Sequence, residues 1–418
     1  MRMLPLTAAC VVSIAVLAAC SNQTQGTTGL PGAAGLPGAA APGQQPMAQY
    51  MPHHKMSPME LLKLQAAGKI PGPSPVGVMK RILNRVETKG QLHLKAHPNT
   101  GTVSVWAAST YDNAIVGLKK NLTKTLAVIG PTYYNNCYYP TQIKVDHSQN
   151  VWAGCQENSN FSAGSVTEWS NAGNELASYS VSCPNGWGGC DYGYFYSYGT
   201  LASAADASHV FAAVEFAYGY KCSPSCNFTY SAGVEWWPAG QPSATPTYDA
   251  LPYGPIYDVY FMDEDNSGNL WFTYYGCLQY YPYTCGNGLG EISNPTSPSW
   301  TFTSVEAPGT YLCAGGVYVS NAGAVLNVTD PCTRYTYQYA LPLSVGGGPS
   351  HTLGPTPANA FGYGDPVSGG FSQNGSKIIL GDSQGWLDRG EVFSNTWKAK
   401  ANPSVYDPQG AAFTPSDK

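Results

Sequence analysis

The cysteines are the residues whose type and spacing say most about the chemistry of this chain. Of the 12 cysteines, all but Cys10 and Cys20 lie between residues 137 and 332. An even set of thiols with short spacings is expected to form disulfides in an exported chain. The alternative is free or metal-binding thiols, although no His or second cysteine pair near Cys222 and Cys226 has zinc-site spacing. The spacing predicts five bonds bracing loops on one face of the fold: Cys137 to Cys155, Cys183 to Cys190, Cys222 to Cys226, Cys277 to Cys285, and Cys313 to Cys332.

Tyrosines gather in the same segments as these cysteines. Tyr mixed with Asn, Ser and Gly is typical of binding surfaces, because the rings supply rigid area and the small polar residues supply hydrogen bonds. The rings also suit the apolar faces of sugars, so a glycan, a cell-wall component and a protein are all candidate ligands. Alternatively, the tyrosines simply cover loops in a chain with few charges. The candidate ligand contacts are Tyr138, Tyr139, Tyr192, Tyr194, Tyr220, Tyr275, Tyr280 and Tyr281.

No set of residues predicts a catalytic or metal centre. His351, in the loop GGGPSHTLGP, is the one histidine expected on the cysteine-rich face, and Glu157 and Glu215 are the nearest carboxylates. The segment Asp263–Gly268 opens like a calcium loop, but Tyr274 stands where a bidentate Glu is required, so we interpret the segment as a tight turn. We therefore expect no catalytic residues, no metal and no cofactor.

Composition narrows the class of protein that positions these residues. Of the 418 residues, 43% are hydrophobic and only 11% are charged, with 20 Lys and Arg against 25 Asp and Glu. A formal net charge of -5 supplies no basic field for a polyanion, which argues against nucleic-acid binding. The high counts of Gly (47), Pro (33) and Tyr (30) favour strands over helices. The composition predicts an all-β fold.

A repeated pair of strand signatures organises the chain from residue 86 to 418. The clearest copies are TQIKVD–HSQN–VWAGC, followed by GSVTEWSNAG and LASYSV, and the unit that contains NLWFTYY and GLGEISN. Four strands per unit is the pattern of a propeller blade. We predict a six-bladed β-propeller in which the last segment, DPQGAAFTPSD, closes the ring against the first blade. A seventh blade built from residues 76–94 and a two-sheet sandwich are the alternatives. The second-strand signature is centred on Trp106, Trp152, Phe211, Trp271, Leu326 and Ile379.

The strings GNLWFT, DHSQNVW and GSVTEWS resemble blades of virginiamycin B lyase-like, NHL-type and gluconolactonase-type propellers. The resemblance covers about residues 91–418 and implies that the Trp fills the gap between blades. It rests on structural residues, so it implies a fold and no activity. A lyase or lactonase acting at the central channel is kept as the enzymatic alternative, and no catalytic residue matches those families.

The N-terminus predicts export and a lipid anchor. Residues 1–19 form an apolar stretch shaped like a signal peptide, and Leu17-Ala18-Ala19-Cys20 resembles the lipobox of bacterial lipoproteins. The resemblance implies that Cys20 is acylated with palmitate-type chains and anchors the protein in the cell envelope, at the outer membrane or cell surface. We expect a Gly/Pro-rich tether over residues 20–56, a short helical linker over 57–85, and a monomer whose membrane contact is the lipid.

Overall fold

A computed structural model describes residues 102–415 of the chain except for internal gaps. The predicted signal peptide, tether and helical linker therefore lie outside the described residues, as does Cys20. Within the described part no helix is long and apolar enough to cross a membrane. The gaps are 111, 131, 133–136, 158–163, 183–193, 198–207, 221–226, 253–255, 257, 278–284, 314, 321–322, 358–365, 383–385, 393, 402–404 and 406–407.

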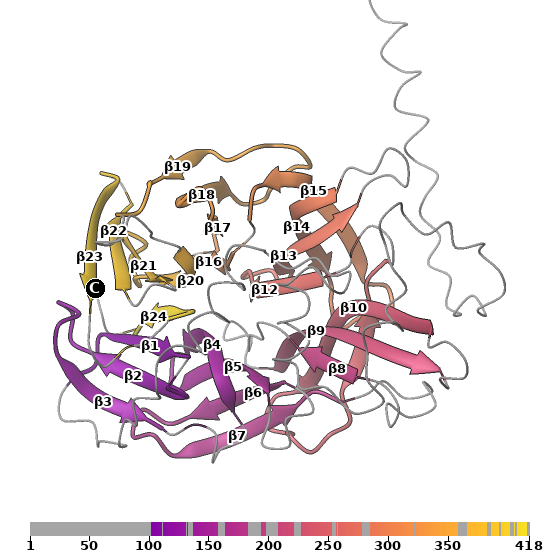
Figure 1. Ribbon diagram of the computed structural model, residues 1–418, viewed down its shortest axis with the longest axis horizontal. Coiled ribbons are helices and arrows are strands. Elements are labelled where there is room, and N and C mark those ends of the chain that lie inside the picture. Colours follow the sequence, from indigo (N-terminus) through magenta and orange to yellow (C-terminus); the bar gives the residue numbers. More distant parts are fainter. Residues whose placement is uncertain are drawn as a thin grey trace, which may run out of the picture. The chain divides into compact units, whose positions relative to one another are not determined.

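The described chain folds into six antiparallel sheets of four strands, arranged as the blades of a propeller (Figure 1). From the inner strand outward, blade 1 holds β24 (Ala411–Phe413), β1 (Val105–Ser109), β2 (Ala114–Leu118) and β3 (Thr125–Ile129). Blade 2 holds β4 (Tyr138–Val145), β5 (Val151–Glu157), β6 (Ser165–Trp169) and β7 (Glu175–Ser180). Blade 3 holds β8 (Tyr194–Ser197), β9 (His209–Tyr220), β10 (Asn227–Pro238) and β11 (Thr247–Ala250).

The second half of the ring repeats this plan. Blade 4 holds β12 (Asp258–Glu264), β13 (Leu270–Cys277), β14 (Cys285–Ser293) and β15 (Thr301–Tyr311). Blade 5 holds β16 (Val317–Val319), β17 (Val325–Asp330), β18 (Tyr335–Ala340) and β19 (His351–Leu353). Blade 6 holds β20 (Pro366–Phe371), β21 (Lys377–Asp382), β22 (Trp386–Glu391) and β23 (Thr396–Ala401). The predicted all-β fold with six blades is confirmed, and the alternative of a two-sheet sandwich was wrong. Residues 76–94, the alternative source of a seventh blade, lie outside the described residues.

The C-terminal strand closes the ring, as the sequence predicted. In Figure 1 the yellow β24 lies at the inner side of the indigo β1, where Val105 pairs with Phe413. The amide of Ala108 donates to the carbonyl of Gly410 at 2.9 Å, and the amide of Thr414 donates to the carbonyl of Ser104 at 3.0 Å. The first blade therefore takes its inner strand from the far end of the chain.

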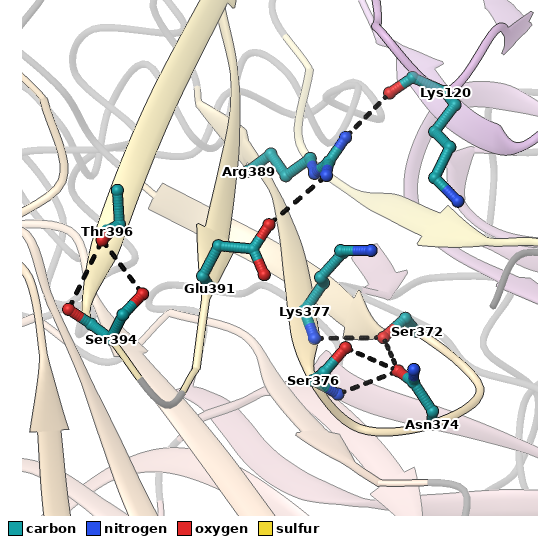
Figure 2. Close-up of polar contacts among 9 residues, drawn as sticks. All are labelled: Lys120, Ser372, Asn374, Ser376, Lys377, Arg389, Glu391, Ser394 and Thr396. Carbon is teal, nitrogen blue, oxygen red and sulfur yellow. Dashed lines mark hydrogen bonds and ion pairs between the residues drawn. The ribbon is translucent and has the colours of Figure 1, made fainter.

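A second contact joins blades 6 and 1 at the outer part of this seam. Figure 2 shows the guanidinium of Arg389 between the two blades. One nitrogen donates to the main-chain carbonyl of Lys120 in blade 1 at 3.2 Å, and another lies 3.4 Å from a carboxylate oxygen of Glu391. In the nearby turn, the side chain of Asn374 accepts from the hydroxyl of Ser372 at 2.9 Å. Because these contacts are exposed or half-buried, each adds little to the stability of the junction between blades 6 and 1.

The core lies between neighbouring blades, where the second strand of each blade presents a large side chain. Trp106 packs with Val151 and Trp169 of blade 2, and Trp271 packs with Val317 of blade 5. The side chains of a strand alternate between its two faces, so one such position per blade can fill the gap to the next blade.

Blade 5 departs from the predicted alignment of this position. Leu326 points back toward Trp271 of blade 4, and Asn327, fully buried, takes the side that faces blade 6. The turn before β17 is one residue longer than the turns of blades 2 and 4: Ser320 donates its amide to the carbonyl of Val325, five residues on, whereas Asp146 and Asp265 donate to carbonyls four residues on. The extra residue shifts the strand and reverses its faces.

In blades 2 and 4 an aspartate holds the turn between the first and second strands. Asp265 accepts from the amide of Asn269 at 3.1 Å and from the indole of Trp271 at 2.9 Å, and Asp146 plays the same role before Trp152. Gly268 supplies the required positive φ of 80°. The interpretation of this segment as a tight turn therefore agrees with its hydrogen bonding.

Candidate functional site

We call the face where the inner strands begin, at Tyr138 in blade 2 and Asp258 in blade 4, the upper face. Three disulfides lie on it, and each matches a pair assigned from the sequence. Cys137 and Cys155 have Cα atoms 5.1 Å apart, Cys277 and Cys285 have Cα atoms 4.1 Å apart, and Cys313 and Cys332 have Cα atoms 5.5 Å apart. Disulfides are typical of exported proteins. The other two pairs, Cys183 with Cys190 and Cys222 with Cys226, lie outside the described residues.

The bond between Cys313 and Cys332 adjoins a buried carboxylate, Asp330. Among the described residues these three form the single group of His, Cys, Asp or Glu side chains close enough to share a metal ion. Both sulfurs are committed to the disulfide, however, and Asp330 accepts the amide hydrogens of Leu312, Cys313, Cys332 and Thr333 at 3.0 to 3.2 Å. Burial raises the pKa of Asp330. Its role is to cap the disulfide loop.

Two of the candidate tyrosines stand together at the start of β4. The ring centroids of Tyr138 and Tyr139 are 6.4 Å apart, and both side chains are half-buried. Tyr139 has a φ of 53°, a conformation that costs a residue with a side chain about 1 kcal/mol or more. Its amide donates to the side-chain oxygen of Asn113 at 2.7 Å, and Asn113 in turn accepts from the amide and hydroxyl of Thr132. Blade 1 therefore holds the main chain of Tyr139 in blade 2, two residues after Cys137.

The other candidate tyrosines are spread over blades 3 and 4 or lie outside the described residues. Tyr275 is half-buried in β13 of blade 4, two residues before Cys277. Tyr194 begins β8 and Tyr220 ends β9, which places their backbones at the upper face. The last three, Tyr192, Tyr280 and Tyr281, lie outside the described residues.

Polar side chains that the sequence analysis missed occupy the centre of the ring. Gln142 of β4 is 1% exposed, and its amide nitrogen donates to the carbonyl of Met262 in blade 4 at 3.0 Å and of Val317 in blade 5 at 3.4 Å. Lys144 of the same strand forms an ion pair with Asp263 of blade 4. In the sequence, the signal for this polar centre was that Gln142 and Lys144 stand two residues apart, and so on one face, of a predicted inner strand.

Asp263 is fully buried and accepts two main-chain hydrogen bonds in addition to its ion pair with Lys144. Its carboxylate accepts the amide of Val319 in blade 5 at 2.8 Å and the amide of Glu264 at 2.7 Å. The charge of Asp263 is thus neutralised by Lys144 and hydrogen-bonded on both oxygens, which is what a buried carboxylate requires. The inner strands of blades 2, 4 and 5 are cross-linked where an open channel would run.

The structure corrects the expected position of His351. It begins the outer strand of blade 5, where it pairs with Gln338 and is exposed, and it does not lie in a loop entering blade 6. The blade needs a fourth strand, and His351–Leu353 supply it by pairing with β18. Glu157 ends β5 and Glu215 lies within β9.

The sequence matches no protein-family model and no curated protein. Solved structures with a similar fold include a nidogen/laminin complex, at 12% identity and a TM-score of 0.47 over 76% of this chain and 100% of that chain. Regucalcin, a calcium-binding protein from Agrobacterium tumefaciens, is 13% identical with a TM-score of 0.40 over 66% and 78%. The Cps50 (Swd1) β-propeller domain of Myceliophteria thermophila is 11% identical with a TM-score of 0.45 over 78% and 92%. At these identities the likeness concerns the fold alone.

Proposed function

We propose that this protein is an exported, lipid-anchored β-propeller that binds a glycan or polypeptide of the cell envelope on its upper face. The observation that carries the proposal is the pair of half-buried rings of Tyr138 and Tyr139 beside the Cys137–Cys155 disulfide, where Asn113 of the neighbouring blade accepts the main-chain amide of Tyr139 at its positive φ. Strained residues persist where the surrounding structure over-determines them, and such positions cluster at ligand sites. Tyrosine rings on an ordered main chain bind with little loss of conformational entropy, because a Tyr side chain has only two rotatable χ angles.

The centre of the ring favours binding over the enzymatic alternative. A lyase or lactonase acting at the channel needs open space and converging catalytic groups. Gln142 and the ion pair of Lys144 with Asp263 instead tie three inner strands together.

The binding proposal is tested with glycan and peptide arrays, followed by titration of the best ligand. Replacing Tyr138 and Tyr139 with Ala should weaken binding about 30-fold, the ratio that corresponds to an aromatic hot spot of about 2 kcal/mol. Asn113→Ala, which removes the acceptor for the amide of Tyr139, should give an intermediate loss. Tyr248→Ala, on the outer strand of blade 3, is the matched control and should bind normally. Absence of any array binding, or equal affinity in all variants, would count against the proposal.

The lipid anchor is tested separately by Cys20→Ser. Without the thiol no acyl chain can be attached, so the protein should move from the membrane fraction to the soluble fraction. A Cys20→Ser protein that stays with the membrane, at the wild-type ratio, would refute the anchor and leave the binding face unaffected.

A further inference from the structure

The positive charges of the propeller are gathered on one edge. The formal net charge of the chain is -5, yet six of the eight Lys and Arg side chains that the structure describes lie in the adjoining parts of blades 6 and 1. The other two are Lys144, at the centre of the ring, and Arg334, in blade 5. We call the six residues the basic edge. They are Lys119, Lys120, Lys124, Lys377, Arg389 and Lys398.

Three members of the basic edge share one face of blade 6. Arg389 of β22 lies directly opposite Lys398 of β23. Lys377 of β21 lies directly opposite Glu391, which is two residues after Arg389 on β22. Residues that are directly opposite, or two apart on a strand, project from the same face of a sheet. All three cations therefore lie on the face from which Arg389 reaches blade 1.

The other three members belong to the turn between β2 and β3 of blade 1. The amide of Lys119 donates to the carbonyl of Lys124 at 3.0 Å and closes this turn, and all three lysines are exposed. The guanidinium of Arg389 donates to the carbonyl of Lys120 at 3.2 Å (Figure 2). The turn of blade 1 thus lies against the cationic face of blade 6, and the two groups of residues form one surface.

Few acidic groups balance this charge. Glu391 is the one carboxylate among the described residues of β21, β22 and β23 that shares the cationic face, and it lies 3.4 Å from Arg389. Asp382 and Asp388 are buried. Asp388 lies directly opposite Leu380, which packs against blade 5, so these two acids face the other side of the sheet. The basic edge therefore carries a net positive charge in an acidic protein.

The pairing of Arg389 with Lys398 costs stability. Like charges directly opposite each other on neighbouring strands repel. Lys398 is exposed, so an uncharged polar side chain would suit this position better. Departures from local stability rules are expected at functional surfaces. The like-charge pair is thus explained if a negatively charged partner contacts this edge.

The basic edge lies at the end of the propeller opposite the upper face. Successive strands of a blade alternate in direction, and the inner strands begin at the upper face, so second strands begin and third strands end at the opposite face. In blade 6 the second strand begins at Lys377 and the third ends at Glu391, and in blade 1 the third strand ends directly before Lys119. The cations and the pair Tyr138 and Tyr139 are therefore at opposite ends.

We propose that the basic edge docks on the phosphate headgroups of an anionic phospholipid membrane. The proposal rests on the lipid anchor of the proposed function. An acyl chain on a flexible tether leaves the orientation of the propeller open. The tether also keeps the propeller at a high effective concentration near the membrane, so a weak second contact is enough to orient it. A basic patch supplies such a contact with anionic lipids. Docking in this way turns the upper face away from the membrane, toward its ligand.

The test measures cosedimentation of the full chain with lipid vesicles, and every protein carries Cys20→Ser so that no acyl chain contributes. Phosphatidylcholine vesicles with about 30% phosphatidylglycerol are compared with vesicles of phosphatidylcholine alone. We expect binding to be about 10-fold or more stronger with the anionic vesicles at about 0.1 M salt. This preference should disappear at about 1 M salt, where charges are screened beyond roughly 3 Å.

Single substitutions locate the contact. Lys398→Gln removes one exposed cation of the basic edge and should weaken binding to the anionic vesicles about fivefold. Arg334→Gln is the matched control, because it removes a cation from the turn between β17 and β18 at the upper face and should leave binding unchanged. Without vesicles, Lys398→Gln should melt no lower than its parent, since its repulsion with Arg389 is gone.

The outcomes separate the alternatives. Weaker binding in Lys398→Gln but not in Arg334→Gln supports the proposal. Equal binding to both kinds of vesicle overturns it, and so does an equal loss in the two variants, because net charge would then control binding. Binding to heparin without binding to anionic vesicles also overturns it and indicates a soluble polyanion. If Lys398→Gln melts lower than its parent, Lys119→Gln is judged by the same criteria. No arm contains an acyl chain, so these results leave the test of the anchor independent.

Discussion

Removing the side chain of Phe413 should destabilise the whole ring, although it lies in a strand of only three residues. Phe413 is 5% exposed and packs with Val105, Ile379 and Leu387 between blades 6 and 1. Its strand, β24, is the inner strand of blade 1 and comes from the opposite end of the chain. Because so few residues close blade 1, the closure depends on the packing of each one.

The expected size follows from burial. A Phe→Ala change in a core costs about 3–5 kcal/mol, and we expect the lower end, about 3 kcal/mol, because a strand near a chain end can relax into the cavity. With an unfolding entropy of about 2.1 cal/mol/K per residue, a propeller of roughly 300 residues should melt about 5 °C lower. A truncation that removes residues 408–418 also deletes the hydrogen bonds of Gly410 and Thr414, so its loss should be larger.

The assay is differential scanning calorimetry of the wild type, Phe413→Ala and the truncated chain. Phe302→Ala is the control, because Phe302 is half-buried against Phe272 on the outer strand of blade 4 and does not take part in ring closure. Its loss should be smaller than that of Phe413→Ala. If the truncated chain melts within about 2 °C of the wild type, β24 does not hold the ring closed and the reasoning is refuted.

Three other variants probe the disulfides, the centre and a buried acid. Replacing Cys137 and Cys155 with Ser should cost about 3 kcal/mol in unfolding free energy, the loop entropy for a separation of 18 residues, and free thiols at these positions in the native protein would contradict the bond. Lys144→Met leaves buried Asp263 without its cation and should cost about 3 kcal/mol, most of which Asp263→Asn should restore in the double variant; additive losses in denaturant unfolding would contradict the coupling. Burial raises the pKa of Glu235 well above its usual value, so the folded state binds a proton more tightly than the unfolded chain and loses stability as pH rises from about 4.5 through the raised pKa. Glu235→Gln should therefore raise the melting temperature at pH 7 and lose that advantage near pH 4, whereas a pH-independent difference would be inconsistent with this account.

Repeating local patterns explain which parts of the fold could be predicted. Trp152 and Trp271 each follow a turn that is held by an aspartate. In the strand after the turn, successive side chains face opposite neighbouring blades, so the sequence indicates which of them are buried between blades. The closing role of Ala411–Phe413 was also predictable. This segment resembles the first strand of a blade but no further strands follow it, and blade 1 has no clear first strand of its own in the sequence, so the two were expected to pair. Leu326 was wrongly aligned with Trp152 and Trp271, because the turn before it is one residue longer than the turns of blades 2 and 4. The extra residue reverses the faces of the strand, and alternation alone does not reveal that shift.

The candidate sites were predicted only where the chemistry is local. The cysteine pairs are separated by 8 to 19 residues, so a hairpin or a strand pair brings their atoms together. The contacts of Gln142, in contrast, reach 120 and 175 residues along the chain. No spacing rule relates such positions, since they meet only when the ring is complete.

The sequence by itself determined the class of fold, the number of blades, the strand that closes the ring and three cysteine pairs within single blades. Each depends on periods of two within strands and on turns between neighbouring strands, which short-range sterics and hydrogen bonding impose. Only the tertiary structure decided which side chains meet between blades: Lys144 with Asp263, Asn113 with Tyr139, and Asp388 facing blade 5. Those contacts depend on how far each sheet twists and how closely the ring packs, and these follow from the burial of all six blades together.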